Sequence, residues 1–70
     1  MFVCTMIENW GVKGKQVVAD TNDKANTICK MYLSSRRVIN VEVHNTTTGR
    51  TSTVSMVNGK MAVVQVKETR

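Results

Sequence analysis

Hydrophobic positions along this chain change their spacing from every second residue to every third or fourth, and back again. Between residues 20 and 33 the apolar side chains fall along one stripe of an α-helix, at Ala25, Ile28, Cys29, Tyr32 and Leu33. Before and after that segment the period is two, which is typical of β-strands. Because a helix with one apolar stripe needs a surface to bury it, the pattern predicts a helix packed against a sheet.

The alternating segments predict five strands, over residues 2–10, 15–19, 38–44, 51–57 and 60–67. The first of them is apolar on both faces, which favours a central position in the sheet. Residues 11–14, Gly-Val-Lys-Gly, read as a hairpin loop whose two glycines supply positive φ angles. Asp20 or Thr21 is a suitable N-cap for the helix.

The last hairpin has the best-defined register. Asn58-Gly59 is the strongest short signal for a two-residue type I′ turn. This turn pairs Val57 with Lys60, Met56 with Met61, and Val54 with Val63. Val54, Met56, Met61 and Val63 then share the face toward the helix. The remaining apolar residues of the last strand fall on the opposite, open face: Ala62, Val64 and Val66.

The predicted element order is β-β-α-β-β-β. A right-handed crossover from the second strand to the third passes over the first, which gives the sheet order 2-1-3-4-5. The sequence therefore predicts an α+β fold in which a single five-stranded antiparallel sheet carries one helix packed on one face. Residues 1–70 are expected to form one small domain, with a core that includes Ile28, Leu33, Val41 and Val54.

No arrangement of titratable residues matches a catalytic or metal site. Asp20 and Asp23 suit the first turn of the helix. His44 is the only histidine, and we expect it on the open face, away from a core thiol at Cys29. Two cysteines and one histidine also lack the paired spacing of a zinc site. We therefore predict a protein that is not an enzyme and has no catalytic residues, no metal and no cofactor.

The charge balance points to binding instead. Ten basic and five acidic residues give a net charge of +5, which attracts polyanions and acidic partners. The candidate residues for polyanion or partner binding are Lys13, Lys15, Lys24, Lys30, Arg36 and Arg37. The outward positions of the central strands are Asn40, Glu42, His44, Thr51, Thr53 and Ser55. This set does not favour base stacking, so the contact with nucleic acid would be electrostatic. A solvated basic surface without a partner is the alternative.

A second candidate interface is the open face of the sheet. Thr53, Val64 and Val66 would form a half-apolar surface there, suited to a partner protein or to a second copy of the chain as a homodimer. The free edge of the last strand is another contact area.

The start of the chain lacks the pattern of a signal peptide, and no apolar run approaches the roughly 20 residues that span a bilayer. We therefore expect a cytoplasmic protein that makes no contact with a membrane.

Several short segments resemble a class of very small phage and mobile-element proteins. They are residues 2–7, 17–20, 25–32, 41–43 with Thr48-Gly49, and 57–60. One protein of this class inhibits type I-F CRISPR surveillance complexes without catalysis, by occupying the basic channel surface where target DNA would enter. The resemblance implies a non-catalytic accessory factor that inhibits a host protein or nucleoprotein complex. Sequence-independent binding of nucleic acid through the basic face is the alternative.

Overall fold

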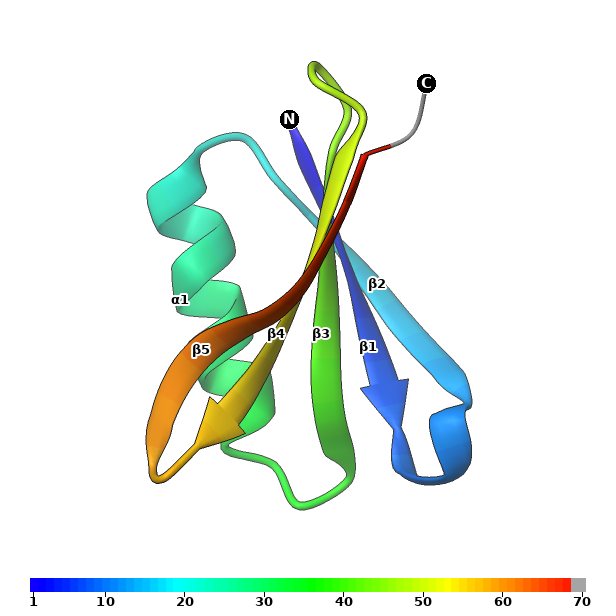
Figure 1. Cartoon of the computed structure of the whole chain (residues 1–70), viewed down its shortest axis with the longest axis vertical. Helices are drawn as coiled ribbons and strands as arrows, with labels where there is room; N and C mark the ends of the chain where they lie inside the picture. The colour runs from blue at the N-terminus through cyan, green and yellow to red at the C-terminus, as the bar shows by residue number, and fades with distance from the viewer. Residues whose placement is uncertain (69–70) are drawn as a thin grey trace.

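The computed structural model describes residues 1–68 and contains five strands and one helix (Figure 1). The strands are β1 (Phe2–Glu8), β2 (Lys13–Ala19), β3 (Val38–Asn45), β4 (Arg50–Val57) and β5 (Lys60–Glu68), and the helix is α1 (Asn22–Leu33). All neighbouring strands are antiparallel, in the order β2-β1-β3-β4-β5. The predicted α+β fold is therefore confirmed. The Trp10 side chain and residues 69–70 lie outside the described part.

The helix starts and stops where its polar residues hold the free backbone groups. The Thr21 hydroxyl accepts a hydrogen bond from the Lys24 backbone N–H at 3.2 Å, and Asp23 adds negative charge to the first turn. At the other end the Ser34 hydroxyl donates to the Met31 carbonyl oxygen. Between these ends the apolar stripe turns Ala25, Cys29 and Leu33 inward to the sheet.

The core lies between α1 and the three strands β2, β1 and β3. Its buried residues are Cys4, Met6, Ala19, Ala25, Cys29, Leu33 and Val41. Of the four core residues predicted from the sequence, Leu33 and Val41 are buried, whereas Ile28 and Val54 are half-buried at the margin. Val54 is marginal because α1 touches β4 only lightly, and β4 and β5 extend beyond the helix.

The connection from β1 to β2 differs from its prediction. β1 ends at Glu8, a 3₁₀ turn spans Asn9–Gly11, and β2 begins at Lys13. The Glu8 N–H donates to the Val12 carbonyl at 2.8 Å, which closes the loop two residues earlier than predicted. Gly11 has the expected positive φ of 75°. Gly14 does not; it lies in β2, where a Cβ would meet the Glu8 carboxyl group at 3.0 Å.

The hairpin of β4 and β5 has the predicted turn but an unpredicted irregularity. Asn58 and Gly59 both have positive φ, 53° and 79°, and Val57 pairs with Lys60 as expected. The register then shifts, because Val54 is opposite Val63 while Thr53 is opposite Gln65. Val64 is thus the extra residue of a β-bulge, and every residue beyond it faces the side opposite to the one predicted.

Candidate cationic interface

Three connections meet at one end of the molecule. The turn from β1 to β2, the loop from α1 to β3, and the turn from β4 to β5 all lie at the lower end in Figure 1. Two of them are joined directly, since the Asn9 N–H donates to the Arg37 carbonyl oxygen at 3.0 Å. Glu8, Asn9, Val12 and Arg37 line a shallow hollow of about 350 Å³ between them. This end is therefore a surface built from segments far apart in the sequence.

The excess positive charge gathers at this end. Six basic residues lie on or next to the three connections, and we call them the cationic end: Lys13, Lys15, Lys30, Arg36, Arg37 and Lys60. Glu8 is the one acidic residue among these segments. All six basic residues are exposed. The cationic end spans the width of the sheet, since Lys13 and Lys15 lie on β2 at one edge and Lys60 begins β5 at the other. An anion at this end is attracted most strongly by the nearest of these side chains and more weakly by the distant ones.

The opposite end is close to electrically balanced in its described residues. The β2–α1 connection, the β3–β4 loop and the last residues of β5 lie there (Figure 1). Their charged side chains are three basic and three acidic: Lys24, Arg50, Lys67, Asp20, Asp23 and Glu68. The molecule measures 31 × 22 × 22 Å, so the charge is separated along its longest axis.

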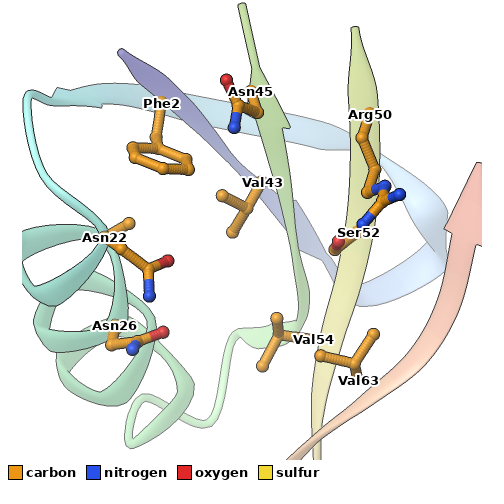
Figure 2. Close-up of a pocket in the computed structure, with 10 residues that line it drawn as sticks. Phe2, Asn22, Asn26, Val43, Asn45, Arg50, Ser52, Val54 and Val63 are labelled. Atoms are coloured by element: carbon orange, nitrogen blue, oxygen red, sulfur yellow. The ribbon is translucent and has the colours of Figure 1, made fainter. Parts of the chain in front are cut away.

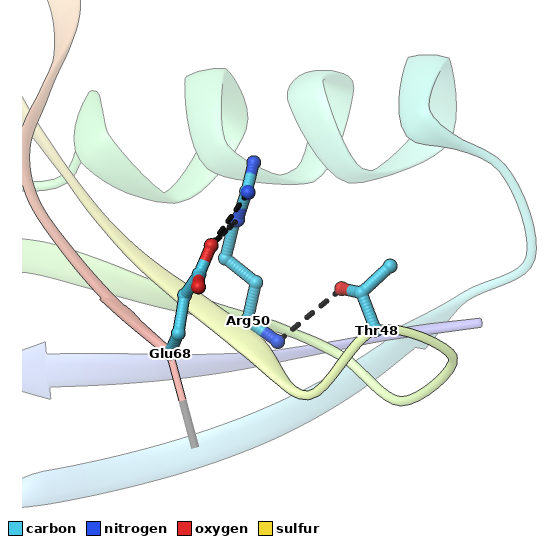
Figure 3. Close-up of polar contacts among 3 residues, drawn as sticks. All are labelled: Thr48, Arg50 and Glu68. Atoms are coloured by element: carbon cyan, nitrogen blue, oxygen red, sulfur yellow. Dashed lines mark hydrogen bonds and ion pairs between the residues drawn. The ribbon is translucent and has the colours of Figure 1, made fainter. Parts of the chain in front are cut away.

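Ion pairs strengthen the contrast between the two ends. Lys24 Nζ lies 3.0 Å from an Asp20 carboxylate oxygen, and its hydrogen bond and charge lower the pKa of Asp20. Arg50 forms a second pair with Glu68 at 2.6 Å (Figure 3). Both pairs are at the balanced end. Among the described residues, no ion pair involves a member of the cationic end.

The structure thus brings together five of the six basic residues predicted as a binding site. Lys24 is the exception, because it lies at the other end of α1 and is paired. Lys60 completes the group and was missed by the sequence interpretation. The signal that could have found it is topological, since the Asn58-Gly59 turn and the loop after the helix must fall at the same end of an antiparallel sheet.

The predicted placement of side chains on the open sheet face is wrong in part. Thr53 is on the open face, opposite Gln65. Val66 is opposite Ser52 and faces the helix side, and Val64 is the bulged residue. In their place Gln65 and Lys67 line a polar hollow of about 270 Å³ on the open face, together with Thr51, Asn40 and Glu42. A half-apolar patch of Thr53, Val64 and Val66 is therefore not formed.

The helix side has a groove between α1 and the β4–β5 hairpin (Figure 2). Its volume is about 230 Å³. Phe2, Val43, Val54 and Val63 contribute apolar surface, and Asn22, Asn26, Asn45, Arg50 and Ser52 contribute polar groups. Asn26 comes from the helix and faces Val54 across the groove in Figure 2. None of the described residues that line the groove has a carboxylate, a thiol or an imidazole.

The two thiols are separated from the one histidine by the sheet. Cys4 and Cys29 are free and buried together in the core. Burial raises the pKa of the Cys29 thiol to about 11 and also raises that of Cys4, so neither is a ready nucleophile. His44 Nδ1 lies 2.8 Å from the Thr51 hydroxyl, on the other face of the sheet. In residues 1–68 no three His, Cys, Asp or Glu residues form a metal-sized group.

In residues 1–68 no helix is both long enough and apolar enough to cross a membrane.

In comparisons with protein-family models, curated proteins and solved structures, nothing matches this chain.

Proposed function

We propose that this protein is a non-catalytic binding protein that places its cationic end on the phosphate-lined surface of a partner. The observation that carries the proposal is the placement of six exposed basic residues from three separate connections at one end, none of which forms an ion pair within residues 1–68. Phosphates contacted by lysine and arginine release counterions, which supplies much of the free energy of such binding. No base-reading element is needed for it.

The partner that we favour is a host nucleoprotein complex, with this protein acting as an accessory inhibitor from a phage or mobile element. That choice of partner rests on the resemblance described above. The surface would differ from the basic channel that the inhibitor of that class occupies, because a cationic end needs an anionic surface. The protein would act by covering phosphates that the complex exposes. The cationic end is suited to that mode, because its three connections form one outward-facing surface rather than a closed pocket.

Free nucleic acid is the second candidate partner, and the same six side chains favour it. The open sheet face argues against recognition by base stacking, since its one described aromatic ring is the half-buried imidazole of His44, which lies 2.8 Å from the Thr51 hydroxyl, and its other described side chains are polar or aliphatic. Binding would then be independent of sequence and strongly dependent on salt.

The test compares two triple variants with the same loss of charge. Lys30→Gln, Arg36→Gln and Arg37→Gln remove half of the basic charges of the cationic end, whereas Lys24→Gln, Arg50→Gln and Lys67→Gln remove the three basic charges of the balanced end. Binding of a short labelled DNA duplex, a single-stranded RNA and a purified nucleoprotein complex is followed by anisotropy over a salt series. We expect the first variant to lower the salt slope by about one per contacted phosphate, and the second to leave it nearly unchanged.

The outcomes separate the candidates. Tight low-salt binding to free DNA or RNA, lost in the first variant alone, supports nucleic-acid binding. Binding to the nucleoprotein complex without measurable affinity for free nucleic acid supports the inhibitor. Equal weakening by both variants would mean that net charge alone matters and would overturn the role of the cationic end, as would the absence of binding to all three probes.

A further inference from the structure

The outer edge of β5 is an unpaired strand with a regular distribution of charge. β5 pairs with β4 on one side only. Its middle residues are uncharged and include Val63, Val64 and Val66, each more than half exposed. A lysine flanks this apolar stretch at either end, at Lys60 and Lys67. Neither forms an ion pair with another residue in the described chain.

The bulge puts both lysines on the same face of the sheet. Lys67 is opposite Thr51 and lines the open-face hollow, while Lys60 lies two residues before Ala62, which is opposite Ser55 on that face. The two lysines are seven residues apart, so a regular strand would point them to opposite faces. Because Val64 is an extra residue in the strand, Lys60 and Lys67 point to the same face. The β5 edge therefore has two lysines on the open face, one at each end of the strand. Between them, Val63 and Val66 face the helix side.

This arrangement disfavours pairing with a second copy of the chain. An antiparallel pair of β5 strands that matches faces along the strand sets Lys60 of each copy opposite Lys67 of the other. Like charges directly opposite are destabilising. If the pairing register of the two β5 strands shifts by one residue, side chains of the open face in one copy lie beside side chains of the helix side in the other, so the faces no longer match. A slip of two keeps the faces matched but leaves the lysines as diagonal neighbours, still within reach of each other.

The same arrangement fits a different strand. We propose that the β5 edge is a binding site for an extended acidic peptide segment of a partner protein, which adds as a sixth, antiparallel strand. A regular partner strand spans the Lys60–Lys67 distance with one residue fewer, because it has no bulge. Its two acids are therefore six residues apart, and the alternate positions between them are apolar on the helix side, where Met61, Val63 and Val66 lie. This site is separate from the cationic end, with which it shares only Lys60.

The experiment titrates the isotope-labelled full chain with the capped peptide Glu-Val-Thr-Val-Thr-Val-Glu and follows backbone amides by NMR. We expect shifts on β5, and about tenfold weaker binding when lysines replace the two glutamates. Moving one glutamate inward by one residue keeps the peptide charge but places that acid on the wrong face, and should weaken binding similarly. In the double variant Lys60→Glu, Lys67→Glu, the lysine-ended peptide should become the better ligand.

Each alternative result would overturn the proposal. They are shifts at the α1–β3 loop in place of β5, binding indifferent to the spacing of the acids, and no shift on β5 at millimolar peptide. A wild-type dimer that dissociates on charging β5 would overturn it too, because the edge would then accept its own copy. Thermal melting of the double variant near the wild-type temperature is the control for folding. Arg36→Glu, Arg37→Glu, with the same charge change elsewhere, is the matched control for peptide selectivity.

Discussion

The two halves of the sheet are built from similar strands but are stabilised in different ways. The half formed by β2, β1 and β3 lies under α1. Every buried side chain of the described residues belongs to these three strands or to the helix that covers them. The half formed by β4 and β5 extends past the helix, and Met56, Val57, Val63, Val64 and Val66 remain exposed there. Strand sequence alone does not decide burial. The position of one helix does, because a single helix about 10 Å wide cannot cover five strands spaced about 4.8 Å apart.

The largest expected difference between the halves is the free energy of core packing. Met6 is 2% exposed under the helix, whereas Met56 is 43% exposed on β4. We expect Met6→Ala to lower the free energy of unfolding by about 2–5 kcal/mol, and Met56→Ala by less than about 1 kcal/mol. Urea denaturation of the two variants and of the wild type measures both losses of unfolding free energy. Equal losses would show that the overhanging half is packed in solution, against another molecule or against itself.

The alkaline stability of the chain should report the covered half specifically. Burial raises the pKa of Cys29 from 9.0 to about 11. The folded protein therefore keeps a proton that the unfolded chain releases, so this contribution is complete below pH 9 and is lost as the pH rises toward 11. The expected loss is about 2–3 kcal/mol. Denaturation curves at pH 8, 9.5 and 11 measure it.

Cys29→Ala is the control for that pH dependence, because it removes this thiol and leaves every other titratable group, including Cys4, in place. Its unfolding free energy should fall less steeply above pH 9 than that of the wild type. An identical slope in both proteins would assign the alkaline loss to other groups.

Backbone strain should cost the same in both halves, in contrast to packing. Gly11, at the start of the covered half, and Gly59, in the β4–β5 turn, have φ angles of 75° and 79°, with open space where a Cβ would lie. Replacing either with alanine should cost about 1 kcal/mol, since only the conformational penalty is involved. Thermal melts of Gly11→Ala and Gly59→Ala would test this. A much larger cost at Gly11 alone would show that the 3₁₀ turn fixes the neighbouring loop.

The smallest effect is expected from the ion pair that joins the ends of β4 and β5. Arg50 and Glu68 are both 57% exposed at their side chains, so water and salt screen their attraction. Glu68→Gln should lower stability by no more than about 0.5 kcal/mol at low salt, and by less at high salt. Asp20→Asn, which breaks the comparable Lys24 pair, should behave alike. A salt-independent loss above 1 kcal/mol at Glu68 alone would mean that this pair holds the overhanging hairpin together.

Local signals were enough to predict the topology and most of the pairing. The Asn58-Gly59 turn correctly fixed the register from Val57 back to Val54. It failed beyond that point because nothing in Val63-Val64-Gln65-Val66 marks a bulge, which glycine often does. The loop at residues 11–14 was misjudged because Gly14 serves close approach to Glu8 rather than a turn. The close approach of Gly14 and Glu8 is a contact between two strands, and the residues around Gly14 in the sequence do not indicate it.

The binding site could be predicted only as a set of residue types. Exposure on the helix was inferred correctly for Lys24 and Lys30 alike. Which of them belongs to a common surface depends on the end of the helix at which each lies, and on the partner at Asp20. Lys60 joins the group only through the fold. Sequence patterning thus indicates a cationic protein, and three-dimensional connectivity decides where the charge gathers.

The separation of charge makes the molecule an electric dipole along its 31 Å axis. In the field of an anionic partner such a body experiences a torque as well as an attraction, so it rotates before it touches. The encounter complex is then enriched in one orientation, with the cationic end, which includes the β4–β5 turn, leading. Association is thereby faster than for a random collision, and only the far end of β5, at Lys67, lies away from the first contact.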